Sequence, residues 1–168
     1  VKLRYFAVLG GLVLIAIPIL WQFVMDEYQK ARIVALFNLD NVEVQANEGY
    51  QQYQGMISIG SGKFSGQGLF QGSRVASNSV PFQQSDYIFS VAGEELGFIG
   101  CSLILLLLFL LLVKILHVVH SSRDDLGKYI CFGYFGIIAL QSISNIGMCL
   151  ALLPVMGVTL PFFSAGGS

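Results

Sequence analysis

Charged residues are scarce in this sequence. Only 11% of its 168 residues are Asp, Glu, Lys or Arg, whereas 55% are hydrophobic and the mean hydropathy is +0.71. A soluble domain carries about 25% charged residues, so the shortage indicates an integral membrane protein. The formal net charge is −1, which gives no basis for nucleic-acid binding or for a basic anchor at a membrane surface.

Cysteine and histidine are also rare, and their spacing argues against disulfides and metal sites. Cys101, Cys131 and Cys149 lie in separate apolar stretches without a CxxC pattern, so we expect small buried side chains. His117 and His120 are the only histidines, and a zinc site needs three or four ligands. We therefore predict no metal site, and we expect the histidines to interact with a helix C-terminus or with lipid headgroups.

Long uncharged runs, by contrast, are abundant. They predict an all-α polytopic membrane protein with about three spans, at about 5–25, 90–117 and 128–153, each long enough to cross about 30 Å of hydrocarbon. Helix-breaking prolines at 154 and 161 predict an irregular, re-entrant tail over 154–168, whose backbone cannot face lipid.

Because the chain begins with Val and ends on "FFSAGGS" without a closing element, we expect a piece of a longer protein.

Basic residues predict the orientation. They flank the first span on its N-terminal side and surround the linker at about 118–127: Lys2, Arg4, Lys114, Arg123 and Lys128. Such ends stay cytoplasmic, so the loop over 26–86 and the tail are predicted to be extracytoplasmic.

Two stretches of the long loop have the periodicity of helices. "DEYQKARIVALF" begins with acids and gathers an apolar patch, and "YQQYQGMISIG" places Tyr50, Tyr53 and Ile57 on one face. Both are predicted to lie at the membrane surface, with ordinary soluble loop structure as the alternative.

Five glycines recur at 60, 62, 66, 68 and 72. They match neither the GxxxxGK loop of nucleotide-binding proteins nor the GxGxxG turn of dinucleotide sites. Their backbone amides could hold an anion, with Lys63 and Arg74 close in sequence, or the stretch could be a flexible connection.

Three acids lie at the edge of the second span. Glu94 and Glu95 are about two turns into the predicted helix, where exposure to lipid would cost a few kcal/mol each, so we expect structural or cavity-lining roles. Asp86 is either the N-cap of that helix or a general base at the membrane surface, and spacing leaves both open. Gln141 and Asn145, spaced i, i+4, predict hydrogen bonds between helices, with cavity lining as the alternative.

Five segments, in order along nearly the whole chain, resemble the signatures of one family. They are "YQKARIVALFN", "GYQQYQGMISIGSGKFSGQGLFQG", "VPFQQSDYIFSVAGEELGFIG", "SISNIGM" and "LLPVMGVTLPFFSAGGS". On these strings the chain resembles the SEDS family, the shape, elongation, division and sporulation proteins that include RodA and FtsW.

The resemblance implies a peptidoglycan glycosyltransferase in the bacterial cytoplasmic membrane. Such enzymes polymerise lipid II at the outer face and work with a class B penicillin-binding protein. The family's catalytic carboxylate, in a stretch that commonly reads PExHTDFIF, corresponds to Asp86. Lys63, Arg74, Gln84 and Ser85 are candidates for substrate binding by their chemistry.

The sequence departs from that motif in places that matter. Phe82, Gln84 and Ser85 replace its Glu, His and Thr, so no role of those residues is carried over. No cofactor is evident, although a divalent cation could share the charge of the leaving pyrophosphate.

Two other functions are compatible with the same residues. A flippase for lipid-linked precursors would use Glu95, Gln141 and Asn145 to line a path, and a non-catalytic scaffold of the wall-synthesis complex would need none of them. The sequence does not distinguish roles in elongation, division and sporulation.

Overall fold

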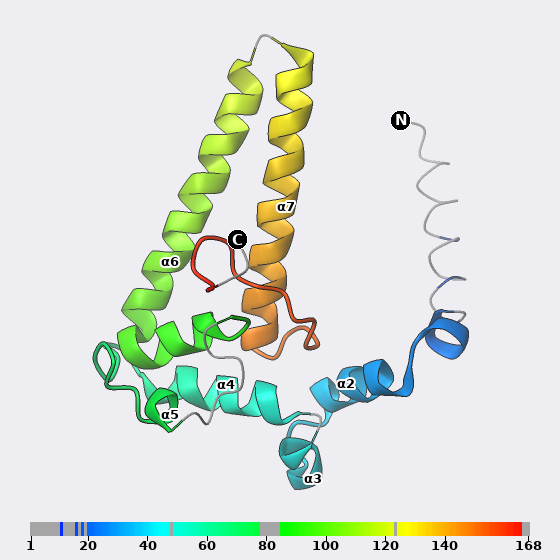
Figure 1. Cartoon of the computed structure of the whole chain (residues 1–168), viewed down its shortest axis with the longest axis vertical. Coiled ribbons are helices and arrows are strands. Elements are labelled where there is room, and N and C mark those ends of the chain that lie inside the picture. Colours follow the sequence, from blue (N-terminus) through cyan, green and yellow to red (C-terminus); the bar gives the residue numbers. More distant parts are fainter. Residues whose placement is uncertain are drawn as a thin grey trace.

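The computed structural model describes residues 20–47, 49–77, 85–122 and 124–165, with the single positions 11, 16 and 18. Within these ranges every regular element is helical (Figure 1). The elements are η1 Leu20–Val24, α2 Glu27–Phe37, α3 Val42–Ala46, α4 Tyr50–Ser61, α5 Ser73–Ala76, α6 Ile88–Ser121 and α7 Asp125–Cys149.

The helices α6 and α7 form an antiparallel pair (Figure 1). Both are long and apolar enough to cross a membrane, and only 28% and 17% of their most apolar stretches are buried. A core helix of a soluble protein would be mostly buried, whereas these helices expose leucine, isoleucine and phenylalanine along their length. The chain is therefore a membrane protein.

A break at Gly97 divides α6 into two parts. Gly97 has φ 66° and ψ −162°, a backbone conformation that is essentially restricted to glycine. Figure 1 shows the part before the break turned away from the upright part that pairs with α7. The upright part, 98–121, is roughly 36 Å long at 1.5 Å per residue, which suffices for the hydrocarbon layer.

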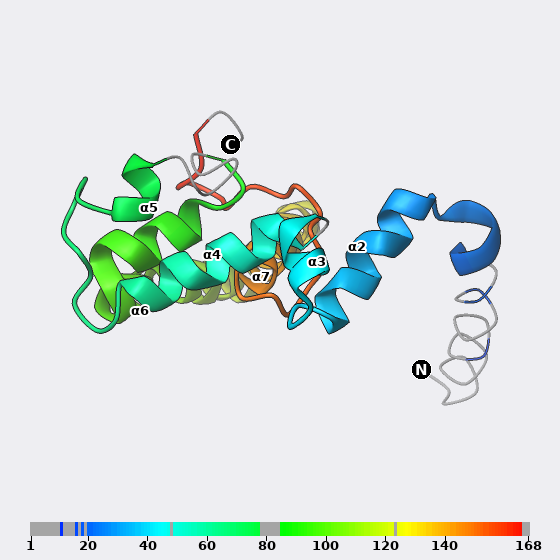
Figure 2. The ribbon, with the colours of Figure 1, turned by 90° about the horizontal axis from the view of Figure 1, so that it is seen from below.

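The helices of the long loop extend across one end of the α6–α7 pair. Figure 2, seen from that end, shows α4 lying over the pair and α2 continuing to one side. The predicted helices of this loop are present, and the residues that α4 buries against the protein are not those of the face with Tyr50, Tyr53 and Ile57, which was predicted for a helix at the membrane surface. Its buried residues are Gln52, Gly55 and Ser58, whereas Tyr50 is exposed. Small and amide side chains face the protein because α4 packs closely on the first part of α6.

The glycine-rich stretch after α4 pairs with the break in α6. Gln67 donates a backbone hydrogen bond of 2.9 Å to the carbonyl of Glu94, and Phe98 donates one of 3.0 Å to the carbonyl of Lys63. Backbone groups that would be unpaired at the break of a helix are thus satisfied by a neighbouring loop. A side chain on this surface would prevent the contact: a Cβ on Gly66 would overlap with the carbonyl of Glu95.

The observed helix bounds differ from the predicted spans. The second helix is longer than 90–117 at both ends, since it continues to Ser121 and includes the bent first part, so little remains of the linker predicted at 118–127. The third ends at Cys149 instead of 153, because the chain turns at Ala151, which has a positive φ of 53°. The span predicted at 5–25 lies largely outside the described residues, and its described end is the π-helix η1.

Candidate functional site

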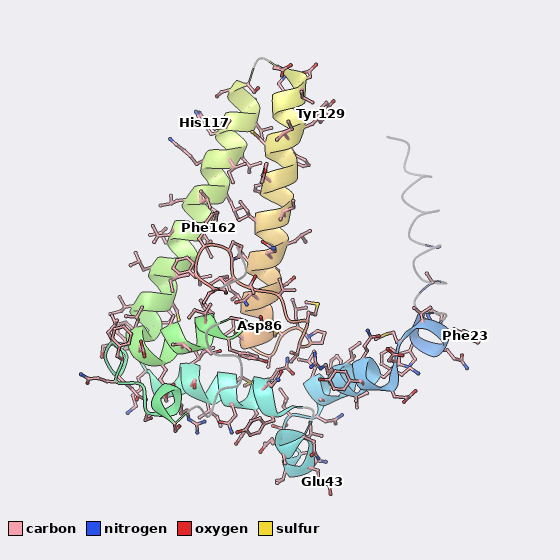
Figure 3. All side chains as sticks on the ribbon, in the orientation of Figure 1. Phe23, Glu43, Asp86, His117, Tyr129 and Phe162 are labelled. Carbon is pink, nitrogen blue, oxygen red and sulfur yellow. The ribbon has the colours of Figure 1, made fainter. Side chains whose placement is uncertain are left out.

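Asp86 lies in the turn that leads into α6, and its side chain is half-buried (Figure 3). The N-cap position of α6 is occupied by Tyr87, and no side chain caps the helix. The N-cap alternative for Asp86 is therefore wrong. Its carboxylate is not used to begin the helix.

Asn145 holds the backbone of Asp86 from the side of α7. Its side chain is fully buried, and its amide nitrogen donates hydrogen bonds of 2.7 Å to the carbonyl oxygens of Asp86 and Val158. The thiol of Cys149, one turn further along, lies 3.7 Å from the same carbonyl of Asp86. These bonds join α7 to the Asp86 turn and to the tail, and they are not the interhelical bonds that spacing predicted. Gln141, one turn earlier, is half-buried.

The tail after α7 folds back over the same turn, as Figure 1 shows. The hydroxyl of Ser164 donates to the carbonyl of Ser85 at 2.7 Å and accepts from the amide of Leu160 at 2.8 Å. A Cβ on Gly157 would lie 3.6 Å from Oδ2 of Asp86, so the tail passes beside the carboxylate. The turn that carries Asp86 therefore meets both α7 and the tail, which are far from it in sequence.

Tyr87 anchors the turn through its ring. The side chain is 1% exposed and packs so closely on α4 that a Cβ on Gly55 would lie 2.9 Å from the ring. Its hydroxyl has no hydrogen-bond partner among the described residues. Burial, followed by the nearby Cys149, raises the pKa of the Tyr87 phenol above its ordinary value, so the group stays protonated at neutral pH. The family motif has phenylalanine at this position, which fits a packing role.

Among the described residues, neither of the two cations predicted for substrate binding forms a hydrogen bond or an ion pair with Asp86. Lys63 is exposed and is bonded through its backbone to Phe98, beyond the break and roughly 15 Å along α6 from its start. The guanidinium of Arg74 donates to Oε1 of Gln54 on α4. Gln84, another predicted substrate residue, lies outside the described residues.

Glu94 and Glu95 both lie before the break in α6. Glu94 is fully buried, and its Oε1 accepts a hydrogen bond of 2.8 Å from the backbone amide of Arg74. Glu95 is 9% exposed, and its carbonyl accepts from Gly68 at 3.0 Å. Both residues therefore belong to the part of α6 that packs on α4 and on the glycine-rich stretch, and not to the upright part that pairs with α7.

The glycine loop does not present its amides to an anion. The amides of Gly66, Gln67 and Gly68 donate to backbone carbonyl oxygens of the protein. Both interpretations from sequence, an anion cradle and a flexible connection, are wrong for these three residues. Recurring glycines here mark close contact between two backbones.

Arg32 is a residue that the sequence did not single out. It lies on α2, and its guanidinium donates a hydrogen bond of 2.9 Å to the carbonyl of Val155 in the tail. Two residues later the tail passes Asp86. The sequence feature that could have indicated Arg32 was an arginine next to apolar residues in a predicted surface helix. An arginine that is only exposed to solvent would give the same pattern.

His117 lies far from Asp86, near the opposite end of α6 (Figure 3). In the described part of the chain, no three His, Cys, Asp or Glu side chains are grouped as metal ligands would be.

Comparison with known proteins agrees with the sequence signatures. Residues 1–168 match the family model of the FtsW, RodA and SpoVE type, described as cell cycle protein. Peptidoglycan glycosyltransferase MrdB of Escherichia coli K12 is 36% identical over 165 residues, which are 98% of this chain and 44% of that protein. Stage V sporulation protein E of Bacillus subtilis is 40% identical over 141 residues, 84% of this chain and 38% of that protein.

A solved structure has the same fold. It is a chain from a study of polymerization and crosslinking by a peptidoglycan synthase complex, with a TM-score of 0.71 and 25% identity over 98% of this chain and 44% of that chain. The chain thus spans less than half the length of these relatives. A family match over every residue, together with identities of 36–40%, shows that the chain belongs to the FtsW/RodA/SpoVE family of cell cycle proteins.

Proposed function

We propose that this chain carries the catalytic carboxylate of a peptidoglycan glycosyltransferase that polymerises lipid II at the outer face of the bacterial cytoplasmic membrane. The observation that carries the proposal is the Asp86 turn. Asn145 and Ser164 donate hydrogen bonds to backbone carbonyl oxygens of this turn. The half-buried carboxylate of Asp86 does not cap α6. The relative named peptidoglycan glycosyltransferase MrdB supports the reaction class.

In this mechanism Asp86 acts as a general base. It accepts the proton of the acceptor sugar's 4-hydroxyl while that oxygen attacks the anomeric carbon of the donor. Undecaprenyl pyrophosphate leaves with the electrons of the broken bond, and the configuration at the anomeric carbon inverts. A base held in place contributes roughly a hundredfold to ten-thousandfold to such a step. The hydrogen bonds to the carbonyl oxygens of Asp86 and Ser85 hold the backbone of the turn and do not use the carboxylate.

The remaining parts of the machinery follow from the same proposal. The basic residues around the linker between α6 and α7 favour an orientation in which the opposite, Asp86-bearing end of the pair lies outside the cytoplasm. The exposed apolar faces of both helices would contact lipid, other helices of the protein and a class B penicillin-binding protein. A divalent cation that shares the charge of the leaving group stays a prediction.

A polymerisation assay in detergent tests the function. The assay uses a protein that contains this chain and is as long as its relatives, which is called the full-length protein below. With purified lipid II it should form glycan chains, because an enzyme needs no membrane leaflets, whereas a flippase or a scaffold would leave lipid II unchanged. Lack of polymer formation by folded full-length protein, with its penicillin-binding protein present, would contradict the proposal.

Asn145 is expected to act as a positioning residue for Asp86. In Asn145→Ala the carbonyl oxygens of Asp86 and Val158 both lose the amide donor, and only the weak thiol contact of Cys149 at 3.7 Å remains for Asp86, so the turn and the tail can shift. A displacement of about 1 Å at a catalytic group costs roughly a hundredfold in rate, and we expect kcat to fall tenfold to a hundredfold with little change in KM. Steady-state polymerisation kinetics of the full-length protein measure both constants.

Ser142→Ala is the matched control for Asn145→Ala. Ser142 is also buried on α7, and its hydroxyl has no partner in the described part of the chain, so kcat should stay near the wild-type value. Equal losses in both variants would show a general effect of changing α7 and would rule out a specific role for Asn145.

A further inference from the structure

A pocket of about 480 Å³ lies between α2 and the start of the tail. Its lining combines polar residues, among them Arg32 and Gln29, with the apolar residues Met25, Ile33 and Met156. Such a lining suits a molecule that has a charged group joined to an apolar chain.

The orientation of Arg32 in this pocket is fixed. Its guanidinium donates to the carbonyl of Val155 at 2.9 Å and to the hydroxyl of Tyr28, and its Cζ lies 4.3 Å from the centre of the Tyr28 ring. These contacts use part of the planar fork of N–H groups and leave the rest for a ligand.

The charge of Arg32 is not balanced by a carboxylate within the described residues. The ion pairs found there join Lys30 to Glu27 and Lys128 to Asp125, and neither includes Arg32. Arg32 is half-buried, so its charge is less screened than that of an exposed arginine. An anion in the pocket would supply the missing partner.

The place of the pocket in the fold selects the kind of anion. α2 extends sideways from the end of the α6–α7 pair that carries Asp86 (Figures 1 and 2), at the depth where lipid headgroups lie if these helices cross the membrane. The helix exposes large apolar side chains, among them Phe37 at 79% and Val34 at 50%. Arginine and tyrosine at this depth typically contact headgroups while apolar neighbours reach the acyl region.

We propose that this pocket binds the phosphate group of a membrane lipid. The free N–H groups of Arg32 hold the phosphate oxygens, and Met25, Ile33 and Met156 contact the first atoms of the apolar chain. An anionic phospholipid and a polyprenyl phosphate share this chemistry, and the experiment separates them. Because Val155 joins Arg32 to the tail that passes Asp86, the bound lipid lies next to the proposed catalytic turn.

Native mass spectrometry of the full-length protein, released from detergent with added lipid, measures retention of the ligand. The probes are phosphatidylglycerol, undecaprenyl phosphate and, as a lipid without phosphate, diacylglycerol. Arg32→Gln should lower retention of a phosphate lipid about tenfold, as expected for losing a hydrogen bond to a charged group, and should leave diacylglycerol unchanged. The phosphate probe whose retention falls identifies the source of the ligand.

Lys30→Gln is the matched control, since it removes the same charge from the same helix at a residue that pairs with Glu27 and does not line the pocket. It should retain lipid as the wild type does. Met156→Trp narrows the pocket and leaves Arg32 itself unchanged. It should lower retention as Arg32→Gln does, so the test stands if Arg32→Gln folds poorly.

Retention of both phosphate lipids by Arg32→Gln and by Met156→Trp at the wild-type level would overturn the proposal. So would an equal loss in Lys30→Gln. Asp86→Asn should bind lipid normally, because Asp86 does not line this pocket, so failure of the catalytic proposal leaves this one intact.

Discussion

Replacing Asp86 by asparagine is expected to lower glycan polymerisation by the full-length protein roughly a thousandfold, close to complete loss. Asparagine has the shape of aspartate but is not a base, so the acceptor hydroxyl keeps its proton. The fold should persist, since Asn145 and Ser164 hold the backbone carbonyls of residues 85 and 86 and not the carboxylate. Polymer formed from lipid II in detergent, together with the melting temperature of each variant, measures both effects.

Glu43→Gln is the control for the loss of one acid. Glu43 lies on α3, well separated from Asp86 (Figure 3), and is exposed, so polymerisation should be unchanged. Wild-type polymerisation by Asp86→Asn would end the assignment of Asp86 as the base. A large fall in the melting temperature of Asp86→Asn would instead assign the carboxylate a structural role.

The parts of the fold that depend on local pattern were predictable from the sequence. Uncharged runs predicted α6 and α7 because a membrane-crossing helix needs about 20 apolar residues in succession. The acids of "DEYQK" predicted the start of α2, where Asp26 and Gln29 indeed meet through a backbone amide hydrogen bond of 3.3 Å. These patterns depend only on residues that are close in sequence, so they can be recognised without the tertiary structure.

The face that α4 buries was not predictable in the same way. Tyr50, Tyr53 and Ile57 form its most apolar side, yet Gln52 and Ser58 are the buried side chains. The reason is tertiary: Gly55 allows Tyr87 to pack against the helix, and Gln52 donates a hydrogen bond of 2.7 Å to the carbonyl of Leu153. Hydrophobic periodicity cannot report a face that is selected by close approach and by backbone acceptors.

The role of Asp86 as the base stays a prediction, and the contacts that hold its turn were not predictable from the sequence. Family motifs singled out Asp86, and the i, i+4 pair Gln141 and Asn145 was visible on one helix face. The bonds of Asn145, however, reach residues that are 59 and 13 positions away in the chain. Partners at such separations are set by the fold, and no local spacing identifies them.

The second large effect is expected for Gly62→Ala. Gly62 ends α4 with φ −73° and ψ −16°, so alanine fits its backbone conformation, and any cost comes from contact alone. A Cβ would overlap with the carbonyl oxygen of Gly93 and lie 2.8 Å from that of Glu94. Because both neighbours are backbone and hydrogen bonds hold the following loop to α6, we expect a loss of roughly 3 kcal/mol in stability.

Gly60→Ala is the control for this prediction. The same substitution two residues earlier should raise the stability where Gly62→Ala lowers it. A Cβ on Gly60 meets nothing within 4 Å, and alanine in place of an exposed helical glycine stabilises by about 0.5–1 kcal/mol. Thermal unfolding of the full-length variants in one detergent compares the two directly. A melting temperature lowered in Gly62→Ala and unchanged or raised in Gly60→Ala assigns the cost to the contact between the two backbones. Similar shifts in both variants would mean that the glycines serve only as flexible positions, and the close packing of α4 on α6 would not be what positions the Asp86 turn.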